Sequence, residues 1–219
     1  MTRPLSPDRA EAFIRANTAL IAPPHVPEIR LHLADEAHGL WQRTEEELEA
    51  IGLQPPFWAF AWAGGQGLAR HVLDNADLVR GRRVLDFATG SGLVAIAAAK
   101  AGAAHVLAAD VDAFCAAAVR LNAAANGVAV EFTETDLVGE PRVWDVILAG
   151  DVFYDRAFAD RLLPWLTEVR AQGCEVLVGD PGRAYLPKTG LEAIGTYQVP
   201  VTRALEDAEV KKTTVWRFG

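Results

Sequence analysis

The chain has 219 residues, of which 51% are hydrophobic and 23% charged, so it can bury the core of one domain, or of one domain with an extension. This composition excludes a disordered chain, which has too little apolar surface to offset the entropy of ordering. The 21 basic and 29 acidic residues give a net charge of −8, which argues against nucleic acid as the main partner because phosphate binding needs Lys and Arg. Small molecules and basic protein surfaces are left as partners.

The N-terminal quarter predicts an extension ahead of the main domain. A Ser-Pro pair at residues 6–7 is typical of a helix start, and we expect this helix to run to about Leu20, before a proline-rich turn. Alternating apolar residues at 29–33 predict a short strand, and the charged residues 45–50 predict a solvated turn of helix. We therefore treat residues 1–53 as a helical and short-strand extension that could act as a lid.

Neither the cysteines nor the first residues indicate export or a membrane. Cys115 and Cys174 fit neither a disulfide framework nor a zinc pattern, so we interpret both as small core residues in a reducing compartment. The longest apolar stretch, residues 93–109, is interrupted by polar residues and is too short for a transmembrane helix. The N-terminus lacks the apolar segment of a secretory signal. We expect a cytoplasmic protein.

In residues 54–219 short apolar strands alternate with helices. This order is typical of the α/β class, and it predicts a doubly wound, Rossmann-like sheet of seven strands, mostly parallel with an antiparallel C-terminal strand. The predicted strands lie at 83–86, 105–110, 128–133, 144–149, 174–178, 190–199 and 213–218. The predicted helices lie at 66–78, 92–101, 113–126 and 156–171, and Pro164 should bend or split the last of them.

A glycine turn between the first strand and its helix indicates a nucleoside-type ligand. Gly90-x-Gly92-x-x-Ala95 lets the backbone approach a ligand closely, and Asp110, at the end of the next strand, can accept hydrogen bonds from ribose hydroxyls. Asp86 distinguishes the cofactors, because a carboxylate at this strand end would repel the pyrophosphate of a dinucleotide. S-adenosyl-L-methionine has no phosphate, and its sulfonium and ammonium groups favour a nearby carboxylate.

The segment Asp86-x-Ala88-x-Gly90-x-Gly92 resembles the first motif of class I methyltransferases that use S-adenosylmethionine. It departs from the family at Ala88, where glycine is preferred, and we expect a small shift in cofactor fit. The resemblance implies that Asp110 holds the ribose and Asp136 the adenine amino group, although Asp136 could instead form a turn. The cofactor-binding residues so expected are Trp62, Asp86, Ala88, Thr89, Gly90, Gly92, Asp110, Val111, Asp136 and Gly150. The product would be S-adenosylhomocysteine.

Three further segments resemble one group within the seven-strand protein lysine methyltransferases. These are the aromatic residues 57–66, residues 151–155 with the acid-x-x-aromatic signature Asp151-x-x-Tyr154, and the C-terminal residues 209–218. They are similar to the electron transfer flavoprotein beta-subunit lysine methyltransferases. The resemblance implies a lysine of that subunit as substrate, with a ribosomal stalk protein as a second candidate.

The expected reaction needs a lysine amine that is neutral and correctly oriented. The pKa of a free lysine is about 10.4, and a desolvated aromatic slot lowers it. We predict Asp151 and Tyr154 as catalytic residues, with the Asp151 carboxylate, aided by the Gly150 carbonyl, orienting the amine. Trp58 and Phe153 are the predicted substrate-binding walls of the slot, where rings can hold a methylated ammonium, although both could instead be core residues.

Other functions stay open at this point. A small-molecule N-methyltransferase would have a deep closed pocket, whereas an open acidic groove would favour a protein substrate. A nicotinamide-dependent oxidoreductase is disfavoured by Asp86. A non-catalytic binding module is disfavoured by the complete set of Asp86, Gly90, Gly92, Asp110 and Asp151. The five histidines form no ligand cluster with Cys or paired carboxylates, so we expect no metal.

Overall fold

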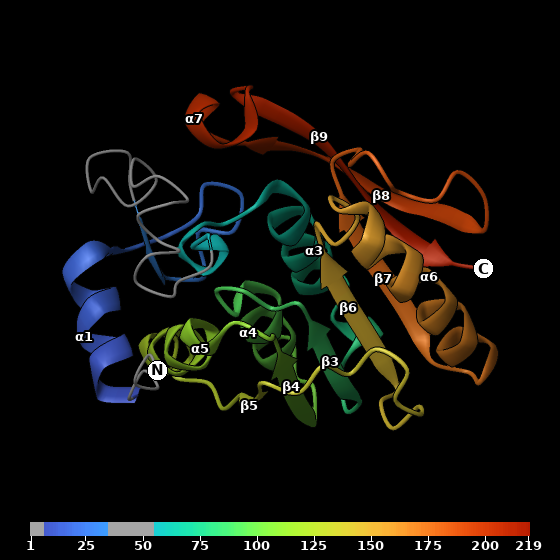
Figure 1. The fold of residues 1–219 in the computed structure, drawn as a ribbon, viewed down its shortest axis with the longest axis horizontal. Helices are drawn as coiled ribbons and strands as arrows, with labels where there is room; N and C mark the ends of the chain where they lie inside the picture. The colour runs from blue at the N-terminus through green and yellow to red at the C-terminus, as the bar shows by residue number, and fades with distance from the viewer. Residues whose placement is uncertain (1–6, 35–54) are drawn as a thin grey trace.

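The structure is a computed structural model that describes residues 7–34 and 55–219 (Figure 1). The strands of its large sheet are β3 (Arg83–Phe87), β4 (His105–Ala109), β5 (Glu131–Thr133), β6 (Val146–Gly150), β7 (Glu175–Asp180), β8 (Leu191–Pro200) and β9 (Val210–Phe218). They lie in the order β5-β4-β3-β6-β7-β9-β8. The first five strands of this order are parallel, and β9 runs antiparallel to both of its neighbours. The predicted fold class is confirmed.

Helices cover both faces of the sheet. They are α3 (Ala63–Asp74), α4 (Leu93–Lys100), α5 (Ala113–Ala125) and α6 (Arg156–Ala171). Successive side chains of β6 point to opposite faces, so Val146 and Leu148 pack in the core with α3 and α4, whereas Ile147 packs with α6. Both cysteines are buried, and α6 is not split at Pro164.

Two short helices were not predicted from the sequence, η2 (Phe57–Ala59) and α7 (Arg203–Glu206). A third, η3 (Ala76–Leu78), forms the end of the helix predicted at 66–78. The helix expected at 66–78 starts three residues earlier and ends at Asp74. The strand expected from residue 128 starts at Glu131, because its pairing with β4 spans only residues 131–133.

The described part of the N-terminal extension consists of α1 (Pro7–Asn17) and a hairpin of β1 (Ala19–Ile21) and β2 (Leu31–Leu33). The prediction that the first helix continues to Leu20 is wrong. The side chains of Asn17 and Thr18 cap the end of the helix by donating hydrogen bonds to the carbonyls of Phe13 and Ile14. The chain then turns into β1. The helical turn expected at 45–50 lies outside the described residues.

Helix α1 packs against α5 rather than against the sheet. Ala10 and Ile14 are buried in a cluster with Phe114 of α5. The Glu11 carboxylate forms an ion pair with Arg120, also on α5, with 2.5 Å between Oε1 and Nη2. The described extension therefore adds a layer on α5. In residues 7–34 and 55–219, no helix combines the length and the apolar character needed to span a membrane.

Helix α3 lies so close to β6 and β7 that the backbones are in contact. A Cβ atom at Gly64 would overlap the carbonyl oxygen of Gly179, and a Cβ atom at Gly179 would overlap that of Gly64. A Cβ atom at Gly150 would lie 2.8 Å from the Gly65 Cα. Only glycine fits at these three positions, and the contact fixes the start of α3 against the ends of the two strands.

We expect Gly64→Ala to lower the free energy of unfolding by about 3 kcal/mol, because neither of the two backbones can move aside for the added methyl group. Gly65→Ala is the matched control on the same helix, since its Cβ would meet only the Leu93 Cδ2 at 4.0 Å. It should keep or raise the stability, by up to about 1 kcal/mol through helix propensity. Denaturant unfolding measures both, and equal stabilities would contradict the backbone contact.

Candidate active site

A cavity of about 430 Å³ opens at the carboxyl ends of the parallel strands, where Phe87, Ala109 and Gly150 end β3, β4 and β6. Its charged lining consists of five aspartates, Asp86, Asp110, Asp112, Asp136 and Asp151, and two arginines, Arg161 and Arg183. Acids therefore exceed bases by three. The cavity is suited to a cationic ligand and would repel a pyrophosphate.

Asp86 is the most deeply buried acid of this lining. It lies on β3, four residues before Gly90 of the glycine turn, and it is 1% exposed. Oδ2 accepts hydrogen bonds from the Thr89 hydroxyl at 2.5 Å and from the Ala95 amide at 2.8 Å. Burial raises the pKa of Asp86 to about 7, and the nearby charge of Asp110 adds to this. Within the described residues no Lys or Arg forms an ion pair with Asp86, so a cationic ligand would find an uncompensated carboxyl.

The glycine turn adopts left-handed backbone angles at three positions. The φ angles are 54° at Ala88, 53° at Gly90 and 82° at Gly92. At Ala88 the methyl group carries a strain of about 1–2 kcal/mol that glycine would avoid, which adds to the expected shift in fit. Gly92 does not line the cavity: it precedes α4, and a Cβ atom there would lie 3.2 Å from the Val119 Cγ2.

The predicted nucleoside side of the cavity gathers Asp110, Val111 and Asp136. Asp110 Oδ2 accepts from the Gly90 amide at 2.9 Å, which ties the end of β4 to the glycine turn. Val111 is 66% exposed at the edge of the cavity. Asp136 accepts from the Val138 amide, as a turn-forming Asp does, and pairs with Arg161 at 2.6 Å, which lowers its pKa. Both interpretations of Asp136 are therefore compatible with its position.

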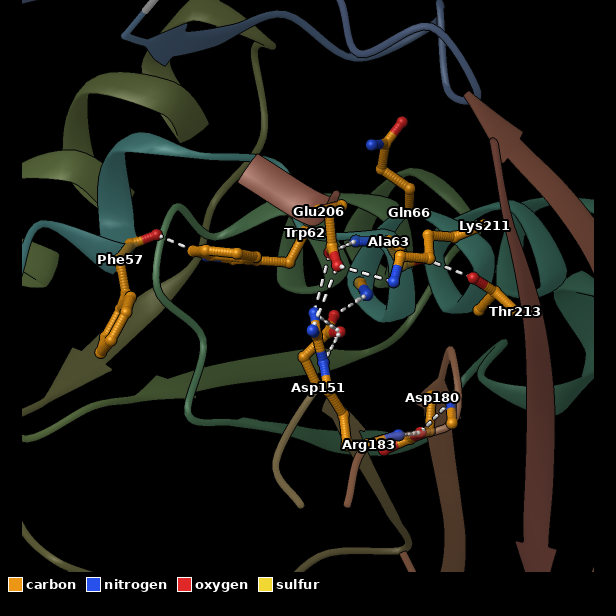
Figure 2. Close-up of polar contacts among 12 residues, drawn as sticks. Phe57, Trp62, Ala63, Gln66, Asp151, Asp180, Arg183, Glu206, Lys211 and Thr213 are labelled. Carbon is orange, nitrogen blue, oxygen red and sulfur yellow. Dashed lines mark hydrogen bonds and ion pairs between the residues drawn. The ribbon is translucent and has the colours of Figure 1, made fainter. Parts of the chain in front are cut away.

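Asp151, directly after β6, is held by α3, by β7 and by Arg183 in the turn after β7, and Figure 2 shows its side chain beside that of Arg183. Its backbone is left-handed, with φ of 57°, and its amide donates to the Gly179 carbonyl. Oδ2 accepts from the Gly65 amide at 2.9 Å, and Oδ1 accepts from Arg183 Nε at 3.0 Å and Nη2 at 2.7 Å. Burial raises the pKa of Asp151 to about 6, an effect that Arg183 opposes and Glu206 reinforces.

Arg183 and Glu206 were missed by the sequence analysis. Arg183 follows β7 in a turn that Asp180 holds by accepting from the amides of Gly182 and Arg183 at 2.6 and 2.7 Å. The Asp-Pro-Gly-Arg sequence after a buried strand was the available signal. Glu206 on α7 accepts from Arg183 Nη2 at 2.8 Å and Nη1 at 3.1 Å, and Lys211 Nζ lies 3.9 Å from it. No local pattern marks Glu206, because α7 reaches the site from the loop between β8 and β9.

Aromatic side chains form the mouth of the cavity. Tyr154 is 53% exposed and its ring lies 5.8 Å from that of Phe57, which was not predicted as a site residue. Phe57 in turn lies 5.8 Å from Trp62, whose indole donates to the Phe57 carbonyl. Trp58 also lines the cavity but is buried, with its ring stacked on Phe114. Phe153 is fully buried in the core under α6 and does not line the cavity, so it occupies a packing position.

The lining fits S-adenosylmethionine better than the other cofactors considered. A cationic sulfonium and ammonium match the uncompensated carboxyl of Asp86 and the excess of acids, while the left-handed turn at Gly90 leaves room for close approach. Trp62, Thr89 and Gly150 line the same cavity, as predicted for residues that would hold this cofactor. In the described part of the chain, His, Cys, Asp and Glu form no group of three or more that could hold a metal ion.

Known methyltransferases are similar to this chain in sequence or in fold. Residues 68–152 match the family model described as ribosomal protein L11 methyltransferase (PrmA). The chain is 40% identical over 214 residues to an electron transfer flavoprotein beta subunit lysine methyltransferase of Xenopus laevis, covering 94% of this chain and 86% of that protein. It is 34% identical over 216 residues to the human protein of that name, covering 95% and 81%. Magnesium protoporphyrin IX methyltransferase from Synechocystis, solved with S-adenosylmethionine, shares the fold with a TM-score of 0.52 and 18% identity over 71% of this chain and 78% of that one.

We expect Thr89→Val to raise the pKa of Asp86 further above 7, by about one unit, because the variant removes a hydrogen bond that stabilises the ionised carboxylate. Titration of the aspartate carboxyl carbons by NMR measures this shift. Thr133→Val is the control, since the Thr133 hydroxyl donates to Thr135 and not to a carboxylate. An unchanged or lowered Asp86 pKa in Thr89→Val would contradict the described hydrogen bond.

Proposed function

Because the chain belongs to the family of electron transfer flavoprotein beta subunit lysine methyltransferases, we propose that it methylates lysine side chains of an electron transfer flavoprotein beta subunit. The chain is a methyltransferase, and its cofactor is S-adenosylmethionine. That cofactor supplies a methyl group on a positively charged sulfur, and a nitrogen lone pair forms the new N–C bond while the electron pair of the C–S bond stays on sulfur.

The observation that carries the proposal is the buried carboxylate of Asp151 at the inner end of an aromatic opening. Asp151 lines the cavity at 8% exposure, and the exposed rings of Phe57 and Tyr154 line the same cavity nearer the surface. A lysine side chain is long enough to pass such rings, which attract its cationic end, and to present its nitrogen to a carboxylate that accepts an N–H. Asp151 thus supports orientation of the amine, and the rings support desolvation.

Two features favour a protein over a small molecule as substrate. Phe57 is 40% and Tyr154 53% exposed, so the opening can be reached by a side chain that projects from a folded surface. The net charge of −8 and the excess of acids in the cavity favour a basic partner. A ribosomal protein is the weaker candidate substrate. The match to the L11 methyltransferase model spans only residues 68–152, so it omits Phe57 and Arg183, which line the substrate side of the cavity.

We expect the purified protein, incubated with labelled S-adenosylmethionine and electron transfer flavoprotein beta subunit, to label lysines of that subunit, as mass spectrometry would identify. The rate should fall steeply with added salt, since the partners attract each other electrostatically. Asp151→Asn is the matched variant: it should lose most of the turnover but keep cofactor affinity within a few-fold. Lysines of the beta subunit that stay unlabelled would contradict the proposal.

We also expect cofactor binding to depend on the ionisation of Asp86. The carboxyl has a pKa of about 7 and binds a cation best when ionised, so binding must expel a proton at lower pH. The affinity for S-adenosylmethionine should therefore fall about tenfold from pH 8 to pH 6. In Asp86→Asn the affinity should be weaker at pH 8, and this part of the pH dependence should vanish. Calorimetry measures both, and the same slope in both proteins would show that another group titrates.

A further inference from the structure

Arg183 bridges two acids of the proposed lysine site, Asp151 and Glu206 (Figure 2). Its Nε and Nη2 donate to Asp151 Oδ1, and its Nη1 and Nη2 donate to the two carboxylate oxygens of Glu206. The guanidinium carbon lies 5.7 Å from the centre of the Trp62 ring. The side chains of Arg183, Asp151 and Glu206 are 21%, 10% and 2% exposed, so water screens these charges weakly.

The position of Arg183 bears on the protonation of a lysine at Asp151. An isolated carboxylate would stabilise the ammonium form and so oppose formation of the neutral amine that must attack the methyl group. The positive charge of Arg183, whose Nη2 lies 2.7 Å from Asp151 Oδ1, offsets the charge of the carboxylate. An oxygen of Asp151 can then still accept an N–H from the amine. The negative charge of Asp151 no longer stabilises the ammonium form of the lysine over the neutral amine.

The other charged groups around this pair do not replace Arg183. Glu206 of α7 is negative and reinforces the effect of Asp151, and Lys211 of β9 lies 3.9 Å from Glu206 and does not contact Asp151. Asp180 of β7 is a further buried acid next to the Arg183 turn. The remaining titratable groups that line the cavity are Asp86, Asp110, Asp112, Cys115, Asp136, Tyr154 and Arg161. Among the groups named, only Arg183 brings a positive charge into contact with Asp151.

We propose that Arg183 is a positioning residue of the methyl-transfer site, whose guanidinium offsets the charge of Asp151 so that the substrate lysine is held there as a neutral amine. The ammonium that enters the cavity gives one proton to water, and the electron pair of that N–H bond becomes the lone pair of the neutral amine. The two hydrogen bonds to Glu206 and the Asp180 turn hold the guanidinium in place while the lysine binds. This inference rests on the proposed lysine methylation and adds the reason why it can proceed near neutral pH.

The test is the pH profile of kcat at saturating cofactor and electron transfer flavoprotein beta subunit. In Arg183→Gln the rising limb should move to higher pH by about 1–2 units, which leaves about a tenth or less of the activity at neutral pH and restores it in alkali. KM for the protein substrate should not rise, since the freed Asp151 still attracts the ammonium. Arg183→Lys keeps the charge and should hold the limb near its wild-type position.

Arg217→Gln is the matched control, because Arg217 also bridges two acidic side chains, those of Glu175 and Glu192, but lies outside the cavity. It should leave the limb in place. Warming should move the limb of wild type and Arg183→Gln to lower pH, as it does for an amine and not for a carboxyl group. A thermal shift induced by S-adenosylmethionine shows that each variant is folded and binds cofactor.

The outcomes separate the two proposals. A limb that stays in place in Arg183→Gln, whatever the height of the profile, would overturn the role of Arg183, and so would a limb that does not move on warming. Wild-type protein that binds cofactor but leaves the lysines of the beta subunit unmethylated would instead overturn the proposed substrate, on which the role of Arg183 rests.

Discussion

The site depends on the place where the backbone of α3 touches those of β6 and β7. Because Gly64 and Gly179 allow this contact, the Gly65 amide reaches Asp151 Oδ2, and the Asp151 amide reaches the Gly179 carbonyl. These two hydrogen bonds hold Asp151 at a left-handed φ of 57°, which costs a residue with a side chain about 1–2 kcal/mol. The direction of the Asp151 carboxylate is thus set by the packing of α3 on the sheet, which brings these two hydrogen-bond partners to Asp151.

Two buried acids of the cavity are balanced in different ways. Asp86 and Asp151 both have a raised pKa, about 7 and about 6, and burial is the largest cause for each. Asp86 accepts hydrogen bonds from the neutral Thr89 hydroxyl and the Ala95 amide. Neither group carries a positive charge, so a cationic ligand can balance the carboxylate. Asp151 has Arg183 as a cationic partner within the chain. This difference matches a site in which one acid meets a cationic cofactor and the other meets a nucleophile that must become neutral.

The sequence predicts those parts of the site that depend on local order along the chain. The alternation of strands and helices and the acids at strand ends suffice to bring Asp86, Asp110 and Asp151 to one edge, because parallel strands end on the same side. Contacts between loops are not encoded locally. Glu206 meets Arg183 only because the β8–β9 loop folds back. Phe153 is buried under α6 while the adjacent Tyr154 is 53% exposed, and strand alternation does not predict this difference because both residues follow the end of β6. Polar side chains at residues 17 and 18 likewise end α1 where its apolar spacing continues.

The two sides of the cavity are built by different means, and this explains how one fold can serve several substrates. The cofactor side is a strand, a glycine turn and a helix within the residues that match the L11 methyltransferase model, and backbone geometry does much of its work. The substrate side comes from η2, the Arg183 turn and α7, which lie outside that match and act through side chains. An acidic cavity that attracts a basic surface also tends to keep an ammonium protonated. A fixed cation beside the accepting carboxylate is the physical means by which attraction and reactivity can coexist, and the loops, not the shared fold, supply it.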